Sequence, residues 1–291
     1  MSCLFFYNTT ASAASINNCN LIVNMSASKI LQTKLNFLVV GKSGGDYASI
    51  QDAIDNAYDT PSNPVTIIIK PGVYHEYIIS VGRNISLVGV DKETCIIRND
   101  SGDYYKAPLK ISGNGYVSNL TFLATHDDNI KCKIPSYAVQ CDSEGAGKLT
   151  FYNCKLVSNQ NSAVGIGMHQ DQTIIFDKCE FIKNSIYGCG SFYCHNDVTS
   201  NITNQHLVIK DCHITTSSGV AMRIDDANMY NGGTNSSMDI SFYNNILHSE
   251  EKEELNVVYF RDISINGGIC GQIKLNADSF GNNVSSLNAL Q

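Results

Sequence analysis

The feature that most constrains this chain is a short pattern that recurs five times between residues 117 and 248. Each copy reads apolar, polar, marker, polar, apolar, and the markers are Leu120, Cys154, Cys179, Cys212 and Asn245. Successive markers are 34, 25, 33 and 33 residues apart. Within each copy the apolar and polar residues alternate as they do in a β-strand, and the marker is expected to sit at a bend.

Repeats of this length that alternate like strands and lack helical periodicity predict a β-solenoid. Leucine-rich and ankyrin-type arrays need leucine or helical signatures, and a β-sandwich would show hairpins spaced by about 8–12 residues. In a parallel β-helix like residues stack from coil to coil, so the cysteine markers are expected to form a buried column. The expected fold class is therefore all-β, a single-stranded right-handed parallel β-helix.

One amphipathic helix is expected before the coils, in the stretch "DYASIQDAIDNAYD". Its apolar residues recur at i, i+3, i+4 and i+7 from Ile50 to Ala57, and Asp46 is the expected N-cap. Such a helix would cover the open end of the solenoid, which otherwise exposes strand edges and core. A strand from Val65 to Tyr74 is expected to follow it and open the stack.

The domain boundaries follow from where the coil pattern begins. Residues 1–36 lack the pattern and are interpreted as an N-terminal attachment or capping segment, while residues 37–291 form the β-helix domain. The chain begins with no basic region ahead of its short apolar stretch, so no cleaved signal peptide is expected. No apolar run is long enough to span a bilayer.

Composition narrows the classes of partner and cofactor. The net charge is −7 and no cluster of Lys or Arg is present, which argues against a nucleic-acid partner. The 11 cysteines are an odd number without a Cys-x-x-Cys pair, which favours buried free thiols over a disulfide framework or a zinc site. We expect no metal and no cofactor.

Three stretches resemble the opening of pectin methylesterases and related right-handed parallel β-helix proteins: "GDYASIQDAID", "VTIIIKPGVYHE" and "NISLVGVDKETCII". The resemblance is good from about Gly44 to Asn119 and weaker to about Cys179. It implies a structural role, without chemistry, for the Gly-x-Tyr-x-Glu element at Gly72, Tyr74 and Glu76.

The catalytic motifs of those esterases are poorly matched. Tyr137 stands where the family has an oxyanion-stabilising Gln, Asn161 follows Gln160 where the family has a general-acid Asp, and Ile186 stands at the nucleophilic Asp. The chain also has no Trp and no Leu-Gly-Arg-Pro-Trp motif. Because Asn cannot transfer a proton and Ile cannot attack an ester, we expect the fold without the esterase mechanism.

The stretch "GMHQDQ", with Cys-Glu-Phe after it and Arg-Ile-Asp further on, resembles β-helix proteins of phage and prophage tails. This resemblance implies a polysaccharide or cell-surface glycan as partner, and a homotrimer or a larger assembly as the working form. It leaves the location open between a virion tail and an extracellular protein exported by a non-classical route.

The candidate site is a polar stripe on one sheet. If Val139, Cys141, Met168, Cys194 and Met222 point inward, the residues between them point outward from five successive coils. One predicted lane holds Gln140, His169, His195, Arg223 and Arg261, and the other holds Asp142, Asp171, Asp197 and Asp225. The candidate catalytic residues are Asp171, Asp197, Asp225, His169 and His195. The candidate substrate-binding residues are Gln140, Asp142, Gln160, Arg223, Tyr259 and Arg261.

Three interpretations of this stripe remain open. Neighbouring strands lie about 4.8 Å apart, so a sugar chain laid across them would meet a polar group at every step. Crowded Asp side chains at roughly 5–9.5 Å would instead suit a glycoside hydrolase, and a lyase or a divergent pectinesterase is a further possibility. Alternating charges on an exposed sheet also simply keep it soluble.

Overall fold

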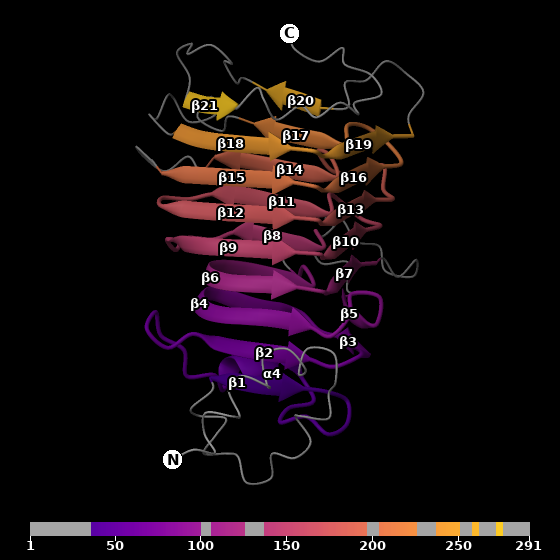
Figure 1. The fold of residues 1–291 in the computed structure, drawn as a ribbon. Helices are drawn as coiled ribbons and strands as arrows, with labels where there is room; N and C mark the ends of the chain where they lie inside the picture. Colours follow the sequence, from indigo (N-terminus) through magenta and orange to yellow (C-terminus); the bar gives the residue numbers. More distant parts are fainter. Residues whose placement is uncertain are drawn as a thin grey trace.

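The computed structural model describes residues 36–99, 106–125, 137–196, 204–225, 237–250, 258–261 and 272–275. Its strands wind in stacked coils, so that strands far apart in the sequence lie side by side (Figure 1). All pairings between the described strands are parallel. The predicted parallel β-helix is confirmed.

The coils present three faces, which we number. Face 1 consists of β8 (Val139–Asp142), β11 (Val164–Met168), β14 (Phe192–Asn196), β17 (Met222–Asp225) and β20 (Val258–Arg261). Face 2 consists of β1 (Phe37–Val40), β2 (Val65–Ile69), β9 (Gly147–Tyr152), β12 (Gln172–Asp177), β15 (Gln205–Lys210), β18 (Ser237–Tyr243) and β21 (Gln272–Leu275). Face 3 consists of β3 (Gly72–His75), β5 (Cys95–Asn99), β7 (Thr121–Ala124), β10 (Lys155–Ser158), β13 (Glu180–Lys183), β16 (His213–Thr216) and β19 (Ile246–Ser249). The long strands β4 (Ile78–Gly89) and β6 (Leu109–Ser118) continue from face 1 into face 2.

The five marker residues lie buried at the bend between face 2 and face 3, as expected. The residue before each marker has a positive φ: Asn119 (53°), Asn153 (50°), Lys178 (56°), Asp211 (54°) and Asn244 (49°). Asn and Asp tolerate this left-handed conformation better than other side chains, which explains their frequency before the marker. The cysteine column is confirmed, because Cys154, Cys179 and Cys212 are buried free thiols, and the Cys179 backbone N–H donates to Cys212 Sγ at 3.3 Å.

A cluster of four buried phenylalanines joins the three faces. Phe151 and Phe176 of face 2 stack with ring centroids 4.7 Å apart. Phe176 also meets Phe181 of face 3 and Phe192 of face 1 edge-on, at 5.2 and 5.5 Å. All four side chains are fully buried, so this cluster is the centre of the core.

The expected helix is present as α4 (Ile50–Asp55), and Ile50, Ala53 and Ile54 are fully buried in the core of the first coils. The predicted N-cap was wrong. The Asp46 carboxylate accepts the Val39 N–H at 2.9 Å, whereas Ser49 caps the helix and its Oγ accepts the Asp52 N–H at 3.2 Å.

The expected strand from Val65 to Tyr74 is two strands, β2 and β3, because Lys70 and Pro71 form a corner between face 2 and face 3. Tyr74 is fully buried, and its hydroxyl donates to the Lys70 carbonyl across this corner at 2.8 Å. The Gly-x-Tyr-x-Glu element is therefore part of the scaffold, as its resemblance implies.

Glu76 anchors α4 to the coils. Its carboxylate accepts the Ile50 N–H at 3.0 Å, the Gln51 N–H at 2.9 Å and the Ser49 hydroxyl at 3.0 Å. Because these bonds involve a charged acceptor, Glu76→Ala should lower the free energy of unfolding by about 2–3 kcal/mol in urea titrations. Glu93→Ala, in an exposed turn, is the control. Equal urea midpoints for the two variants would contradict this anchoring role.

Several expectations fall outside the described residues: the structure of residues 1–35, the side chain of Asp197 and the end of the β-helix domain beyond Leu275. The domain boundaries therefore stay a prediction. Among the residues that the structure does describe, no helix is long and apolar enough to cross a membrane.

Candidate functional site

Strand register arranges the outward residues of face 1 in two rows. The first row contains Lys110, Gln140, Gly165, Tyr193, Arg223 and Tyr259. The second row contains Asp142, Gly167, His195, Asp225 and Arg261. The apolar residues between them on β8, β11, β14 and β17 are buried in the core, as predicted. Gln140, Asp225 and the two glycines of the rows are buried as well, so burial alone does not separate the two sides of these strands.

The predicted lanes themselves were wrong. His195 and Arg261 share a row with Asp142 and Asp225, while His169 and Asp171 belong to neither row. Ile166 and Met168 are both apolar and buried, so the core pattern allows two registers that differ by two residues. The structure pairs Ile166 with Cys141, which places glycines at the outward positions of β11.

Side chains from three successive coils converge over Gly167. A Cβ on Gly167 would lie 2.4 Å from Asp142 Oδ1 and 3.0 Å from His195 Cε1, so both groups lean across this glycine. His169, just after β11, brings its Nε2 to 3.5 Å from Asp142 Oδ1. We call Asp142, His169 and His195 the Asp142 cluster. It needs glycine at position 167 because any side chain there would occupy the meeting point.

The first row supplies a polar acceptor beside this cluster. Gln140 lies on the outward side of β8, as Asp142 does, but only 6% of it is exposed. Its Oε1 has no hydrogen-bond partner within the described part of the protein. The Tyr137 ring packs over Gly165, where a Cβ would lie 2.8 Å from ring carbons. A buried acceptor of this kind is costly unless a donor reaches it.

Tyr193 of β14 and Arg223 and Asp225 of β17 form a second group. Arg223 Nε donates to Asp225 Oδ1 at 2.8 Å, and the Tyr193 hydroxyl donates to Asp225 Oδ2 at 3.3 Å. Asp225 was expected to be open on the stripe, but it is 1% exposed because these two side chains cover it. The hydrogen bond to Asp225 raises the pKa of Arg223, and burial raises the pKa of Tyr193.

The Asp142 carboxyl is held in its charged form. The His169 imidazole, with its Nε2 3.5 Å from the carboxylate, lowers the pKa of Asp142 from the usual 3.8. Burial opposes this, and the charges of His195 and Lys110 lower the pKa further. Asp142 is therefore a carboxylate at neutral pH, and the imidazoles of His169 and His195 flank it.

This pKa has a consequence for stability. Because the folded pKa lies below the unfolded one, Asp142 stabilises the folded chain at pH values above 3.8, and this contribution is lost as the pH falls through the lowered pKa. The difference in unfolding free energy between wild type and Asp142→Asn should therefore be largest above about pH 5 and shrink below about pH 4. Urea unfolding across that range measures it, and a difference that does not vary with pH would contradict the direction of this pKa shift.

Two other predicted site residues lie away from the rows. Asp171 is exposed in the turn after β11, with φ 56°, and accepts a hydrogen bond from Asn204 Nδ2 at 2.8 Å. Asp171 does not lie on face 1, because β11 ends at Met168 and the chain turns after it. Gln160 is buried between β10 and β11, and its amide donates to the Thr125 carbonyl. Tyr259 and Arg261 lie on β20, for which the structure describes the backbone pairing with β17.

The three positions that correspond to the catalytic residues of the esterase motifs have separate environments. Tyr137 lies at the start of face 1, whereas Asn161 is buried and its Oδ1 accepts the Ser162 N–H at 2.8 Å. Ile186 is 78% exposed between β13 and β14. The loss of esterase chemistry stays a prediction, because these environments do not measure activity.

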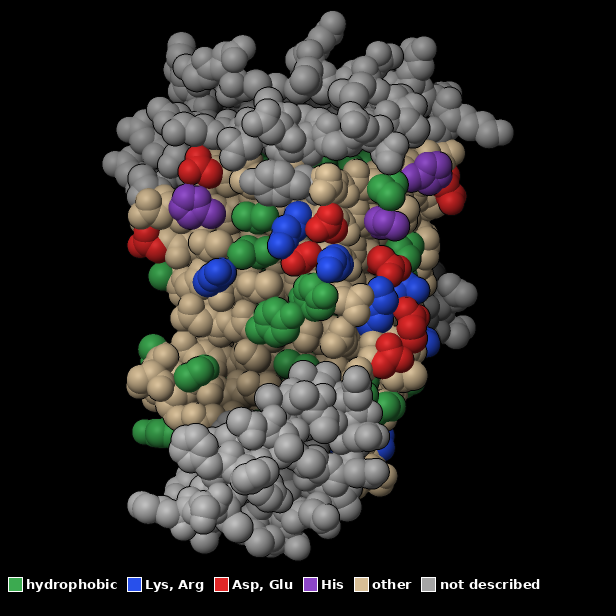
Figure 2. All heavy atoms as spheres, viewed as in Figure 1, with side chains coloured by type: hydrophobic (Ala, Val, Ile, Leu, Met, Phe, Trp, Pro, Cys, Tyr) green, Lys and Arg blue, Asp and Glu red, His purple; other side chains and the backbone are tan. Residues whose placement is uncertain are grey.

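Face 2 shows what an ordinary solvated sheet looks like in this protein. Figure 2 shows acidic and basic side chains side by side on it. Lys210 pairs with Asp177 at 2.9 Å, and His206 lies 3.6 Å from Asp239. These groups are paired across neighbouring strands, in the manner expected of charges that keep a sheet soluble. Face 1 differs, because Gln140 and Asp225 are buried on it and three of its side chains converge over Gly167.

Sequence reasoning missed Lys110, Gly165 and Gly167. The available signal was "VGIGM", in which glycines alternate with apolar residues along a strand. Glycine at alternate positions indicates that neighbouring groups approach the backbone closely. Lys110 precedes Gln140 by a whole coil, so it could be placed only once the register was known. Within the described residues, no group of three or more His, Cys, Asp or Glu is arranged to hold a metal ion.

Comparisons with known proteins gave matches in structure only. No family model matches the chain, and no curated protein matches it. The chain is similar to ORF18 of Geobacillus virus E2, with 15% identity and a TM-score of 0.53, over 83% of this chain and 50% of the viral one. It is also similar to pectin methylesterase from carrot, with 14% identity and a TM-score of 0.44, over 85% of each chain. PemA, the pectin methylesterase of Erwinia chrysanthemi, gives 18% identity and a TM-score of 0.47, over 82% of this chain and 87% of the enzyme.

At such low sequence identity a structural match shows a shared fold but not a shared function. The chain spans half the length of the viral protein, so that protein's whole role does not carry over. The strand pairing and this match together make the chain a parallel β-helix protein whose fold is shared with a viral protein.

Proposed function

We propose that this protein binds a polysaccharide on face 1, with the Asp142 cluster and Gln140 at the centre of the site. The observation that carries the proposal is the convergence of Asp142, His169 and His195 over Gly167. Beside them lies a buried Gln140 oxygen that no described residue reaches with a hydrogen bond. Hydroxyl groups of a sugar are donors and acceptors at once, so they suit a carboxylate, two imidazoles and an amide placed together.

The direction of the rows suits a chain-like ligand. Polar groups recur on successive coils at steps of about 4.8 Å along the axis of the β-helix. The Asp142 cluster occupies three of these coils, and the Arg223–Asp225 pair continues the rows onto the next. A polysaccharide lying along the axis would contact several of these groups, whereas a compact small molecule would contact only one or two.

The spacing of the carboxylates in the described part of face 1 favours binding over glycoside hydrolysis. Asp142 and Asp225 share a row but are three strand steps apart, roughly 14 Å. Glycosidases separate their two carboxyl groups by roughly 5–9.5 Å. Asp225 is moreover engaged by Arg223 and Tyr193 on both oxygens.

A second part of the proposal concerns the kind of assembly in which the protein binds its glycan. We propose a tail-spike or cell-surface glycan recognition module that works as a homotrimer or within a larger assembly and has degenerate esterase motifs. The shared fold with a viral protein and the sequence resemblance to tail proteins support this setting. The net charge of −7 favours glycan over nucleic acid as the partner.

A carbohydrate-active enzyme is the second candidate. The observation in its favour is the contact between His169 Nε2 and Asp142 Oδ1 at 3.5 Å, which orients an imidazole as a general base would be oriented. Such an enzyme could be a hydrolase, a lyase or a divergent pectinesterase acting on an acidic polysaccharide.

The experiment exposes the whole protein to pectins of high and low methyl-esterification and to bacterial capsular polysaccharides. Binding is measured by biolayer interferometry, and products are measured as reducing ends, methanol and unsaturated uronates. We expect binding to one of these classes without product, and a loss of binding in the double variant His169→Ala, Arg223→Ala. Product formation that Asp142→Asn or His169→Ala abolishes would support the enzyme instead. Absence of binding to the whole panel would count against both candidates.

A further inference from the structure

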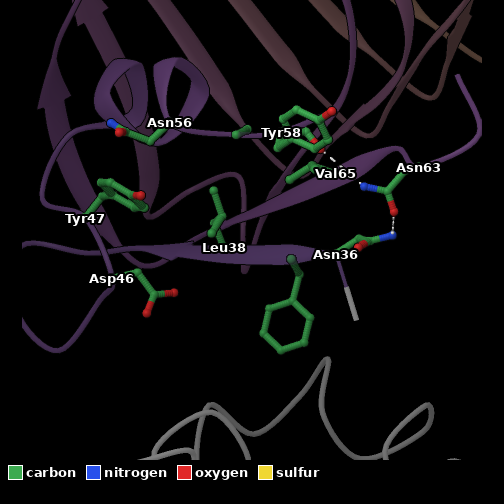
Figure 3. Close-up of a pocket in the computed structure, with 10 residues that line it drawn as sticks. Asn36, Leu38, Asp46, Tyr47, Asn56, Tyr58, Asn63 and Val65 are labelled. Atoms are coloured by element: carbon green, nitrogen blue, oxygen red, sulfur yellow. Dashed lines mark hydrogen bonds between the residues drawn. The ribbon is translucent and has the colours of Figure 1, made fainter. Parts of the chain in front are cut away.

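A concave surface of the described chain lies at its N-terminal end, away from face 1. It is a pocket of about 400 Å³ between β1, the residues on either side of α4, and the start of β2 (Figure 3). Its lining residues are Asn36, Phe37, Leu38, Asp46, Tyr47, Asn56, Ala57, Tyr58, Asn63 and Val65.

The walls of this pocket are apolar and aromatic, while most of its polar groups are already engaged. The Asn36 amide donates to Asn63 Oδ1, and Asn63 Nδ2 donates to the Tyr58 carbonyl at 3.2 Å. Asp46 accepts the Val39 N–H. Tyr58 is 85% exposed, which is unusual for so large an aromatic ring. The surface therefore suits an apolar occupant better than a polar one.

The pocket adjoins the outer edge of β1, which is paired over only part of its length. β1 pairs with β2 along one side, and on its other side Asp46 and Tyr47 bond the Val39 backbone. Among the described strands β1 pairs with β2 alone, so the outer side of Phe37 has no strand partner in that part of the chain. An exposed edge of a β-helix is a site where further strands add, so native proteins cover it.

We propose that residues 21–25 of the same chain, "LIVNM", fill this pocket and cover the edge of β1 at Phe37. The 35 residues before Asn36 enter the described structure at the pocket wall itself. This tether gives them a high effective concentration there. Leu21, Ile22 and Val23 form a short β-prone run bounded by Asn residues, as a strand is. The earlier apolar run at residues 3–7 would close a longer loop at greater entropic cost.

Hydrogen–deuterium exchange on the full chain tests the proposal. Amides of residues 21–25 should exchange at least about tenfold more slowly than an unstructured peptide of the same sequence. Tyr58→Ala should reduce this protection, whereas Tyr187→Ala, which also removes an exposed tyrosine, should not. The triple variant Leu21→Ser, Ile22→Ser, Val23→Ser should accelerate exchange in β1 and lower the melting temperature by roughly 2–4 °C. The matched triple variant Ala11→Ser, Ala13→Ser, Ala14→Ser should leave both unchanged.

Three outcomes would overturn the proposal. The first is unprotected exchange of residues 21–25 in the wild type. The second is protection of residues 3–7 in their place, which would assign the pocket to the other apolar run. The third is protection that disappears on tenfold dilution, which would make a second copy of the chain the occupant. None of these measurements depends on polysaccharide binding.

Discussion

Gly167→Ala is expected to weaken polysaccharide binding by roughly 10–100-fold while the β-helix stays folded. The added Cβ would lie 2.4 Å from Asp142 Oδ1 and 3.0 Å from His195 Cε1, so one or both groups must move out of the site. Each charge-assisted hydrogen bond lost to a ligand costs about 1.5–3 kcal/mol, which gives this range. The substitution is on the outward side of β11, so the core is untouched.

Gly72→Ala is the matched control for this prediction. Gly72 is also a strand glycine, on face 3, and its added Cβ would come no closer than 3.3 Å to the Tyr74 ring. Both variants are compared by biolayer interferometry on the polysaccharide that the wild type binds, with thermal unfolding as a check on folding. Wild-type affinity in Gly167→Ala would show that the convergence over this glycine does not form the binding site.

Phe176→Ala is expected to lower the free energy of unfolding by about 3–5 kcal/mol. Phe176 is fully buried and contacts Phe151, Phe181 and Phe192 from all three faces, so its removal leaves a cavity that no single face can close. Phe176→Leu, which keeps most of the volume, should cost about 1–1.5 kcal/mol.

Urea unfolding followed by far-UV circular dichroism measures this effect. Tyr187→Ala serves as the control, because Tyr187 is an aromatic residue outside the core. If Phe176→Ala and Tyr187→Ala shift the urea midpoint by the same amount, the phenylalanine cluster is not the centre of the core.

The repeated pattern predicted the fold because each of its features is required by the local structure of a coil. A marker position must be buried at a bend, and the residue before it must tolerate a positive φ, which Asn153 and Asp211 do. Alternation likewise identified which apolar residues of β8, β14 and β17 enter the core, because an unpaired polar side chain is costly to bury there.

The register between coils could not be predicted, because it depends on the number of residues that each coil uses to complete its turn. Ile166 and Met168 satisfy the core equally well, so composition alone allowed His169 to stand in the row where Gly167 lies. Asp171 was misplaced for the same reason, since nothing local marks where β11 ends and the turn begins. The outward glycines, which make room for the Asp142 cluster, carry no side chain that a pattern of polar residues could reveal.

The central claim is that the Asp142 cluster on face 1 forms the polysaccharide site. The most direct measurement compares Asp142→Asn with Asp177→Asn, two equal chemical changes on face 1 and face 2. We predict that Asp142→Asn weakens binding at least about tenfold and that Asp177→Asn leaves it unchanged. Equal affinities for the two variants, or a larger loss in Asp177→Asn, would contradict the account.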